Sequence, residues 1–199
     1  MQKLYIGKET YVSLSSAHKL IDELRESGEF DFVSIDAEGS EPSKIVDTLS
    51  SASLFNQSRI LFIKRLYRNK NRSEIIEFLL EYLEKESDEH IILWEDQKVS
   101  AVTKYVKYFK RRNSLEEYDK INKKSFSAYA KEIFEKNNLK VDKRIVTLLV
   151  QRSNYDLERL TNNIKKLKLL EKSELTQRDI EGSVANTIEE DIWKLLDEM

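Results

Sequence analysis

The sequence predicts an α/β protein: a doubly wound, mainly parallel five-stranded sheet followed by a small all-helical domain. In the first half of the chain, short apolar runs rich in β-prone residues alternate with segments whose apolar residues recur at helical spacing. The apolar runs show no polar alternation, which is typical of parallel strands buried on both faces. After about Asp119 the strand signals stop and only the helical spacing continues.

Five short runs have the composition expected of strands, and the signal of the fifth is weaker than that of the others. The runs are Leu4 to Ile6, Phe32 to Ile35, Ile60 to Ile63, Ile91 to Trp94 and Leu115 to Tyr118. Because helical segments lie between them, successive strands are joined by crossovers. This order of elements predicts βαβ units and a parallel sheet.

We expect the helical segments between these runs to cover both faces of the sheet. Their apolar residues are Leu14, Ala17, Leu20, Ile21 and Leu24, then Ile75, Ile76, Leu79, Leu80 and Leu83, then Val102, Tyr105, Val106 and Phe109. In each segment these residues recur at helical spacing, so they form one apolar stripe along a helix. Each stripe is the predicted contact with the sheet.

Residues 1–119 thus predict the sheet domain, and residues 120–184 predict the helical domain. The apolar residues of the helical domain are Phe126, Tyr129, Ile133 and Phe134, then Ile145, Leu148 and Leu149, then Leu157, Leu160, Ile164 and Leu167. Short polar residues before or at the start of these runs are the expected helix caps, and they are Ser125, Asp142, and Asn154 or Asp156.

One more helix is predicted to open at Thr187. It presents Ile188, Ile192 and Leu195 on one face, and the sequence ends soon afterwards with nothing to cover them. We therefore expect residues 185–199 to be the first helix of a further domain.

The composition limits the kinds of function. Lys and Arg total 34 against 36 for Asp and Glu, so the net charge of -2 gives no overall attraction to nucleic acid or to an anionic membrane. Cysteine is absent, which excludes disulfides, thiolate metal sites and cysteine nucleophiles. No apolar run has the length of a signal peptide or a membrane span. We expect a cytoplasmic protein with no membrane partner.

A chain that begins with strand, glycine and helix invites a nucleotide-binding interpretation. A phosphate-binding loop needs the pattern GxxxxGK[ST], because backbone amides wrap the phosphates, the lysine reaches the outer oxygens and the hydroxyl binds magnesium. In the loop Gly7-Lys8-Glu9-Thr10, Gln2 stands where the first glycine belongs and Glu9 replaces the hydroxyl. The sequence therefore predicts no nucleotide cofactor at this loop.

The sequence also predicts no catalytic residues and no metal site. A nucleotide-bound metal needs a carboxylate at the end of a central strand, but the third run is followed by Lys64 and Arg65. Glu95 and Asp96 follow the fourth run, and we interpret them as a helix-capping turn. The two histidines lie in different elements without nucleophile or metal-ligand spacing around them, and a structural role is expected for His90.

The most unusual feature is the apolar pair Leu54 and Phe55. The segment Ser43 to Ser53 predicts a helix whose core face carries Ile45, Val46, Leu49 and Ala52. At about 100° per residue, a continued helix would turn Leu54 by roughly 150° and Phe55 by roughly 110° from that face.

An exposed Leu-Phe pair flanked by Ser53 and Asn56 indicates an anchor for a hydrophobic pocket on another protein. The alternative is that the helix ends near Ser53 and that the pair folds into the top of the sheet.

Together, these features resemble the delta subunit of the bacterial DNA polymerase III clamp loader, an AAA+-related subunit that binds and opens the sliding clamp. The resemblance covers the whole chain. It rests on the opening Leu4 to Glu9, on the run from Leu49 to Ile63, which is the most specific, and on the tail Thr187 to Asp197. Residues Asn154 to Leu160 also resemble a motif of the family's lid domain, from which Tyr155 and Glu158 depart.

The resemblance implies a particular use for each part of the chain. Leu54 and Phe55 map onto the pair that enters the hydrophobic pocket of the clamp, with Ser53 and Asn56 beside them. The sheet domain would be AAA+-like with a degenerate nucleotide site, so the chain would need no cofactor and no ATP hydrolysis of its own. Its partners would be the clamp, or beta subunit, and other loader subunits bound through a collar domain, with a possible DNA contact within the complex.

Two other functions stay open at this stage. The first is a nucleic-acid-binding module that uses residues 100–112, where basic residues are interleaved with aromatic ones; these are Lys104, Lys107, Lys110, Arg111 and Arg112 with Tyr105, Tyr108 and Phe109. The second is an active AAA+ ATPase, which the missing phosphate loop disfavours.

Overall fold

The computed structural model describes residues 1–51, 58–85, 87–172, 174–185 and 196. The chain divides into two compact units, Met1–Lys120 and Ile121–Met199.

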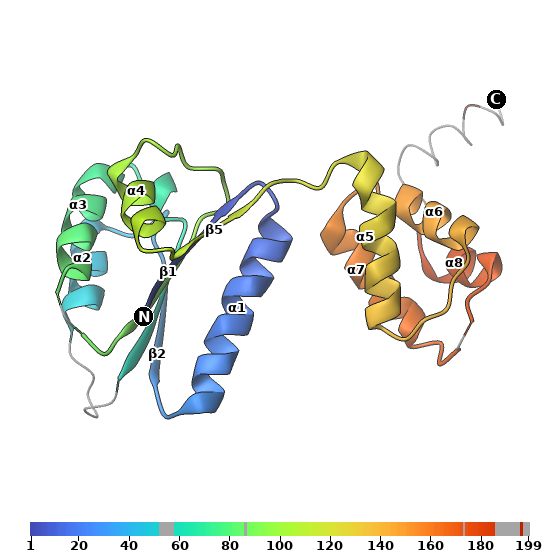
Figure 1. Cartoon of the computed structure of the whole chain (residues 1–199), viewed down its shortest axis with the longest axis horizontal. Helices are drawn as coiled ribbons and strands as arrows, with labels where there is room; N and C mark the ends of the chain where they lie inside the picture. Colours follow the sequence, from blue (N-terminus) through green and yellow to red (C-terminus); the bar gives the residue numbers. More distant parts are fainter. Residues whose placement is uncertain (52–57, 86, 173, 186–195, 197–199) are drawn as a thin grey trace. The chain divides into compact units, whose positions relative to one another are not determined.

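The first unit is built on a five-stranded sheet (Figure 1). Its strands are β1 (Gln2–Gly7), β2 (Asp31–Asp36), β3 (Arg59–Lys64), β4 (His90–Trp94) and β5 (Leu115–Tyr118). They lie in the order β2-β3-β4-β1-β5, and every pair is parallel. The predicted α/β class and all five predicted strands are confirmed. Because the strands are parallel, their amino ends share one edge of the sheet and their carboxyl ends share the other.

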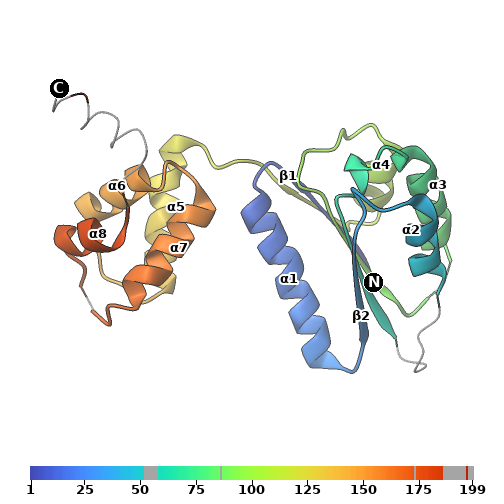
Figure 2. The ribbon, with the colours of Figure 1, turned by 180° about the vertical axis from the view of Figure 1, so that it is seen from behind.

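Helices cover both faces of the sheet, as predicted. The helix α1 (Thr10–Ser27) lies on one face, and α2 (Pro42–Ser50), α3 (Arg72–Leu83) and α4 (Lys104–Arg111) lie on the other, as Figures 1 and 2 show from opposite sides. A short 3-10 helix, η1 (Leu66–Arg68), follows β3. The core between α1 and the sheet includes the buried residues Ala17, Ile21, Phe62, Ile92 and Trp94. The core on the other face includes the buried helix residues Ile45, Leu49, Ile75, Leu79, Tyr105 and Phe109.

The prediction for α4 was right for three residues of its apolar stripe and wrong for Val102. This side chain is 73% exposed because the helix begins only after Thr103, whose side chain caps it by accepting from the Val106 N–H. Tyr108 is buried in place of Val102, and its hydroxyl donates to the carbonyl oxygen of Leu83 at 2.9 Å. The polar end of Tyr108 thus has a partner inside the protein, which allows a tyrosine to fill a core position.

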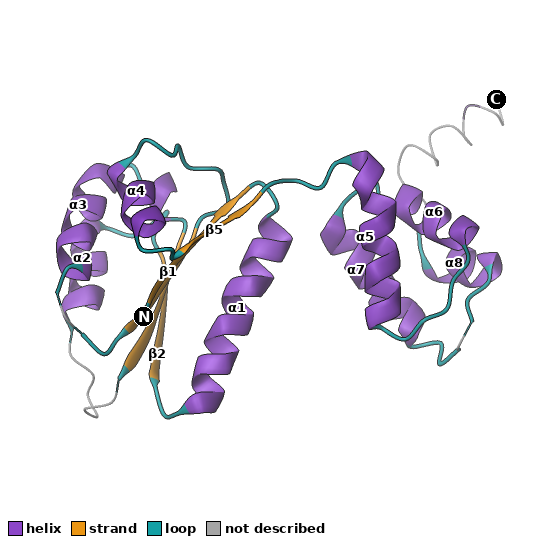
Figure 3. Ribbon diagram, in the orientation of Figure 1, coloured by secondary structure: helices purple, strands orange, loops and turns teal. Residues whose placement is uncertain are grey.

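The second unit is helical, as predicted, and contains α5 (Lys123–Lys136), α6 (Lys143–Arg152), α7 (Leu157–Lys168) and α8 (Gln177–Ser183) (Figure 3). The buried side chains at its centre include Phe126, Phe134, Leu149, Leu160 and Ile164. The predicted caps Asp142 and Asp156 are confirmed, since each carboxylate accepts a hydrogen bond from the backbone of the first turn. Ser125 is not a cap, because α5 begins two residues earlier and Asn122 accepts from the Ser125 N–H at 2.9 Å.

The helix α8 was not predicted from the sequence. It has seven residues, of which one, Ile180, is buried. A helix with so few apolar residues shows no helical period in the sequence. Its signal is the capping box of Thr176 and Asp179, in which each side chain accepts from the other residue's backbone N–H. The helix predicted to open at Thr187 falls outside the described residues, apart from Leu196.

Candidate functional site

The loop after β1 is the first candidate, because nucleotide-binding sheets hold phosphate there. Two of its backbone amides already have acceptors within the protein. The Gly7 N–H donates to the carbonyl oxygen of Gln97 at 3.2 Å, and the Glu9 N–H donates to that of Tyr118 at 3.0 Å. A phosphate would have to displace both of these hydrogen bonds. The geometry therefore supports the prediction that this loop holds no nucleotide.

Gly7 has a packing role in this loop. Its φ angle of 141° is one that side-chain-bearing residues rarely adopt. A Cβ atom at this position would lie 2.0 Å from the backbone oxygen of Tyr118, which pairs with Gly7 across β1 and β5. Glycine is needed here so that two strands can approach each other, independently of any phosphate.

The acidic pair after β4 is bound within the protein. Glu95 is fully buried, and its carboxylate accepts from the Tyr67 N–H at 3.0 Å and from the Tyr105 hydroxyl at 3.0 Å. Burial raises the pKa of Glu95 to about 8, although these two hydrogen bonds act in the opposite direction. Asp96 pairs with Arg68 at 2.6 Å. Glu95 and Asp96 were interpreted from the sequence as a helix-capping turn. Glu95 does accept from the backbone of the short helix η1, through Tyr67, but its side chain is buried.

The end of β3 carries positive charge where a metal-binding carboxylate would be needed. Arg65 pairs with Asp36 and with Glu38, the latter at 2.7 Å. The two histidines lie elsewhere in the first unit. His18 is exposed on α1, and His90 is partly buried at the start of β4 against Phe30. Across the described ranges, no group of three or more His, Asp or Glu residues could hold a metal ion.

The amino edge of the sheet holds a second candidate, centred on Arg59, the first residue of β3. Its side chain is 3% exposed. The guanidinium donates to the carbonyl oxygens of Thr48 at 3.3 Å and Leu49 at 3.1 Å, and to the Ser51 hydroxyl at 3.0 Å. These acceptors belong to the last turn of α2 and the residue that follows it. Arg59 therefore stabilises the C-terminal end of α2, where the helix dipole favours a positive charge.

The charge of Arg59 is balanced by Glu89, which lies just before β4. The Arg59 Nε donates to Glu89 Oε1 at 2.7 Å, and Nη2 donates to the same oxygen. The other oxygen of Glu89 accepts from the Tyr82 hydroxyl at 2.5 Å. Burial and this bond raise the pKa of Tyr82 to about 12, so the hydroxyl keeps its proton. The guanidinium thus lies in a hydrogen-bonded network that joins α2, α3, β3 and the start of β4.

This network flanks the predicted anchor, while the anchor residues Ser53, Leu54, Phe55 and Asn56 lie outside the described residues. The predicted helix through Ser53 was too long. It ends at Ser50 because Ser51 is extended and Arg59 takes the free carbonyls of the last turn. The prediction for Leu54 and Phe55 therefore rests on the residue types and on the resemblance.

The basic segment 100–112 does not offer aromatic side chains to bases. Tyr105, Tyr108 and Phe109 are all buried, and only the basic side chains of α4 are exposed. Arg112 stacks on the Tyr108 ring at 3.8 Å and pairs with Glu84 at 2.9 Å. The arrangement lacks the stacking surface that single-stranded nucleic acid needs.

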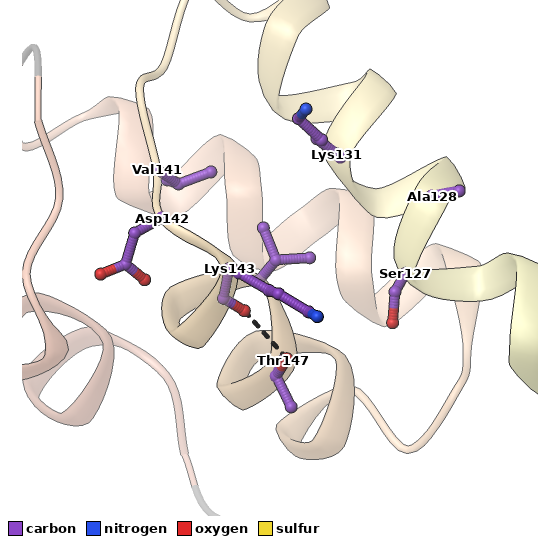
Figure 4. A pocket seen from close by; sticks show the side chains of 8 residues that line it. Ser127, Ala128, Lys131, Val141, Asp142, Lys143 and Thr147 are labelled. Atoms are coloured by element: carbon purple, nitrogen blue, oxygen red, sulfur yellow. Dashed lines mark hydrogen bonds between the residues drawn. The ribbon is translucent and has the colours of Figure 1, made fainter.

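A hollow of about 420 Å³ lies between α5 and α6 in the second unit (Figure 4). Its polar side chains serve the helices: the Asp142 carboxylate caps α6, and the Thr147 hydroxyl donates to the carbonyl oxygen of Lys143 at 2.9 Å. Val141 and Val146 supply apolar lining. The Asp142 carboxylate and the Thr147 hydroxyl are thus both bonded within α6.

Comparisons with solved structures agree on the architecture. The chain is similar to the Bacillus subtilis DNA clamp loader delta protein (YqeN), with 19% identity and a TM-score of 0.67 over 99% of this chain and 62% of that one. It is also similar to the Thermotoga maritima RuvB Holliday junction branch migration motor, with 12% identity and a TM-score of 0.55 over 91% of this chain and 60% of that one. Domain III of the Thermotoga maritima replication initiation protein DnaA matches with 14% identity and a TM-score of 0.50, over 89% and 80% of the two chains.

The strand order and the parallel pairing define the class: an α/β protein whose fold is similar to that of AAA+ proteins such as RuvB, followed in the chain by a helical unit. The family follows from the sequence. Residues 4–119 match the family described as DNA polymerase III, delta subunit, and the chain belongs to that family.

The family match confirms the resemblance drawn from the residues. No curated protein matches the chain. The chain spans less than two thirds of the Bacillus subtilis delta protein and of RuvB. None of the described helices is long and apolar enough to cross a membrane.

Proposed function

We propose that this chain binds the bacterial sliding clamp and helps to open it, as the clamp-binding part of a clamp loader delta subunit. Leu54 and Phe55 are the anchor that enters a hydrophobic pocket of the clamp, and Ser53 and Asn56 lie at its sides. The chain supplies no ATP hydrolysis of its own. Assembly with other loader subunits occurs through a collar domain that residues 185–199 begin.

The observation that carries this proposal is that the segment between Ser51 and Ser58 belongs to the family-matched region and is held at both ends. Arg59 binds the end of α2, and the Ser58 carbonyl oxygen accepts from the Asp31 N–H at 3.1 Å. The described residues on either side of the segment, Ser51 and Ser58, therefore lie at the amino edge of the sheet. That edge is opposite to the loop after β1, so an anchor here would act independently of any nucleotide site.

Binding energy alone can drive such a mechanism. A ligand shifts a conformational equilibrium only by the difference between its affinities for the two states. The chain would thus bind a distorted clamp more tightly than a closed one. The two anchor side chains would contribute roughly 3 to 5 kcal/mol by burial, before the costs of association.

The double substitution Leu54→Ala and Phe55→Ala tests this proposal. Removing both side chains is expected to weaken clamp binding by roughly 100-fold or more, because roughly 3 kcal/mol of burial energy is lost. The affinity is measured by calorimetry with the sliding clamp of the same organism.

The matched control changes another adjacent apolar pair, Leu169→Ala with Leu170→Ala. These residues are 81% and 38% exposed and lie in the second unit, so their loss should leave clamp affinity and folding unchanged. Unchanged affinity of the Leu54 and Phe55 variant, with its circular dichroism spectrum intact, would refute the proposed anchor.

A further inference from the structure

We infer that Arg59 is a positioning residue for the clamp-binding segment, residues 52–57: it joins the described residues on the two sides of the segment and so fixes their positions relative to each other. This inference rests on the proposed function. It assigns a role in binding to a residue that is buried and cannot itself reach the clamp.

The geometry links the two flanks of the segment through one side chain. Arg59 follows the segment after Ser58 and begins β3, whereas Thr48, Leu49 and Ser51 precede the segment at the end of α2. All three accept hydrogen bonds from the same guanidinium. The Ser51 N–H also donates to the carbonyl oxygen of Asp47 at 2.8 Å, which fixes the helix end. The entry and the exit of the segment are therefore held by one planar group.

The position of that group is in turn fixed by the rest of the sheet. Glu89 Oε1 accepts from both Nε and Nη2 of Arg59, and the other oxygen of Glu89 accepts from the Tyr82 hydroxyl. Two N–H donors that converge on one oxygen restrict the orientation of the planar guanidinium as well as its place. Contacts from α3 and from the residue before β4 thus fix the orientation of Arg59, and through Arg59 the position of the end of α2.

Holding the flanks in this way bears on affinity. A segment whose ends are fixed loses less conformational freedom when it binds, and preorganisation of this kind raises affinity without adding contacts. Since Arg59 is 3% exposed, its effect on binding must act through the segment it positions. A lysine at this site would keep the charge beside Glu89 but has no planar fork with which to bind the end of α2.

The experiment measures clamp affinity for Arg59→Lys at a temperature at which thermal unfolding shows every variant to be folded. We expect the affinity to fall by about tenfold, as for the loss of preorganising contacts. A milder second variant, Ser51→Ala, removes one bond of the network without removing a charge and should weaken binding by about threefold. The matched control is Arg65→Lys, which should leave clamp affinity unchanged, because Arg65 follows the carboxyl end of β3 and is also ion-paired.

A double-mutant cycle with Phe55→Ala separates positioning from general damage to the fold. If Arg59 acts by presenting the anchor, Arg59→Lys should weaken binding by less than about threefold once Phe55 has been removed, because the effects of coupled residues do not add. An equal loss in both backgrounds, or unchanged affinity of Arg59→Lys, would overturn the inference. If Phe55→Ala and the Leu54 and Phe55 double variant themselves bind normally, the proposed function fails instead, whatever Arg59 does.

Discussion

Replacing Gly7 by alanine is expected to lower the free energy of unfolding by about 4 kcal/mol or more, which exceeds the effect of most single substitutions. The new Cβ atom would lie 2.0 Å from the oxygen, 2.6 Å from the carbon and 2.7 Å from the nitrogen of Tyr118. These are backbone atoms, so no side chain can rotate to relieve the contact, and β5 would have to move away from β1. The φ angle of 141° adds strain.

Urea denaturation followed by circular dichroism measures this effect, and Gly39→Ala is the matched control. Gly39 lies in the same unit, and a Cβ atom there would meet nothing within 4 Å. The control should change stability by no more than about 1 kcal/mol, since the change mainly restricts the unfolded chain. If both variants were equally stable, the close approach of β1 and β5 would be disproved.

The unfolding free energy should also depend on pH through Glu95. Its pKa is raised from 4.5 to about 8, chiefly by burial, so the folded protein retains a proton that the unfolded chain releases between these values. The contribution to stability is complete below pH 4.5 and is lost as the pH rises through about 8. Within this window the slope from one such group is about 1.4 kcal/mol per pH unit.

Glu95→Gln should remove this dependence, because glutamine keeps the shape and the hydrogen-bonding capacity without a titrating group. At pH 5 the variant and the native protein should be similarly stable, and at pH 8 the variant should be more stable by up to about 4 kcal/mol. Urea denaturation across the pH range provides the measurement. Glu117→Gln, at an exposed position on β5, serves as the control. Parallel pH curves for the native protein and Glu95→Gln would contradict the prediction.

The sheet could be predicted from the sequence because its strands are consecutive apolar residues that must be buried on both faces. Ile60 to Ile63 and Ile91 to Trp94 are such runs, and both proved to be central strands. Even the weaker run Leu115 to Tyr118 was placed, because it follows a helix in the βαβ order. The sequence also indicated that the loop after β1 lacks phosphate-binding residues, although the occupied amides of Gly7 and Glu9 were visible only in the structure.

The Arg59 network could not be predicted, since sequence patterns treat arginine as an exposed residue. Its burial depends on Glu89, Tyr82 and the end of α2, which come together only when the chain folds. The same contacts end α2 at Ser50, which explains why a helix predicted from apolar spacing alone ran too far. Arg59 itself was the signal that could have been used. An arginine at the first position of a buried strand needs both a carboxylate and carbonyl acceptors nearby.

The two hydrogen bonds in the loop after β1 do not depend on the side chains of their acceptor residues. Their acceptors are the main-chain carbonyls of Gln97 and Tyr118, which every amino acid carries. No exchange of side chains at those two positions would free the amides, and a glycine in place of Gln2 would leave both bonds intact. The two amides become available to a phosphate only if β5 and the residues after β4 move, so substitutions at the loop itself are not sufficient to create a phosphate site there.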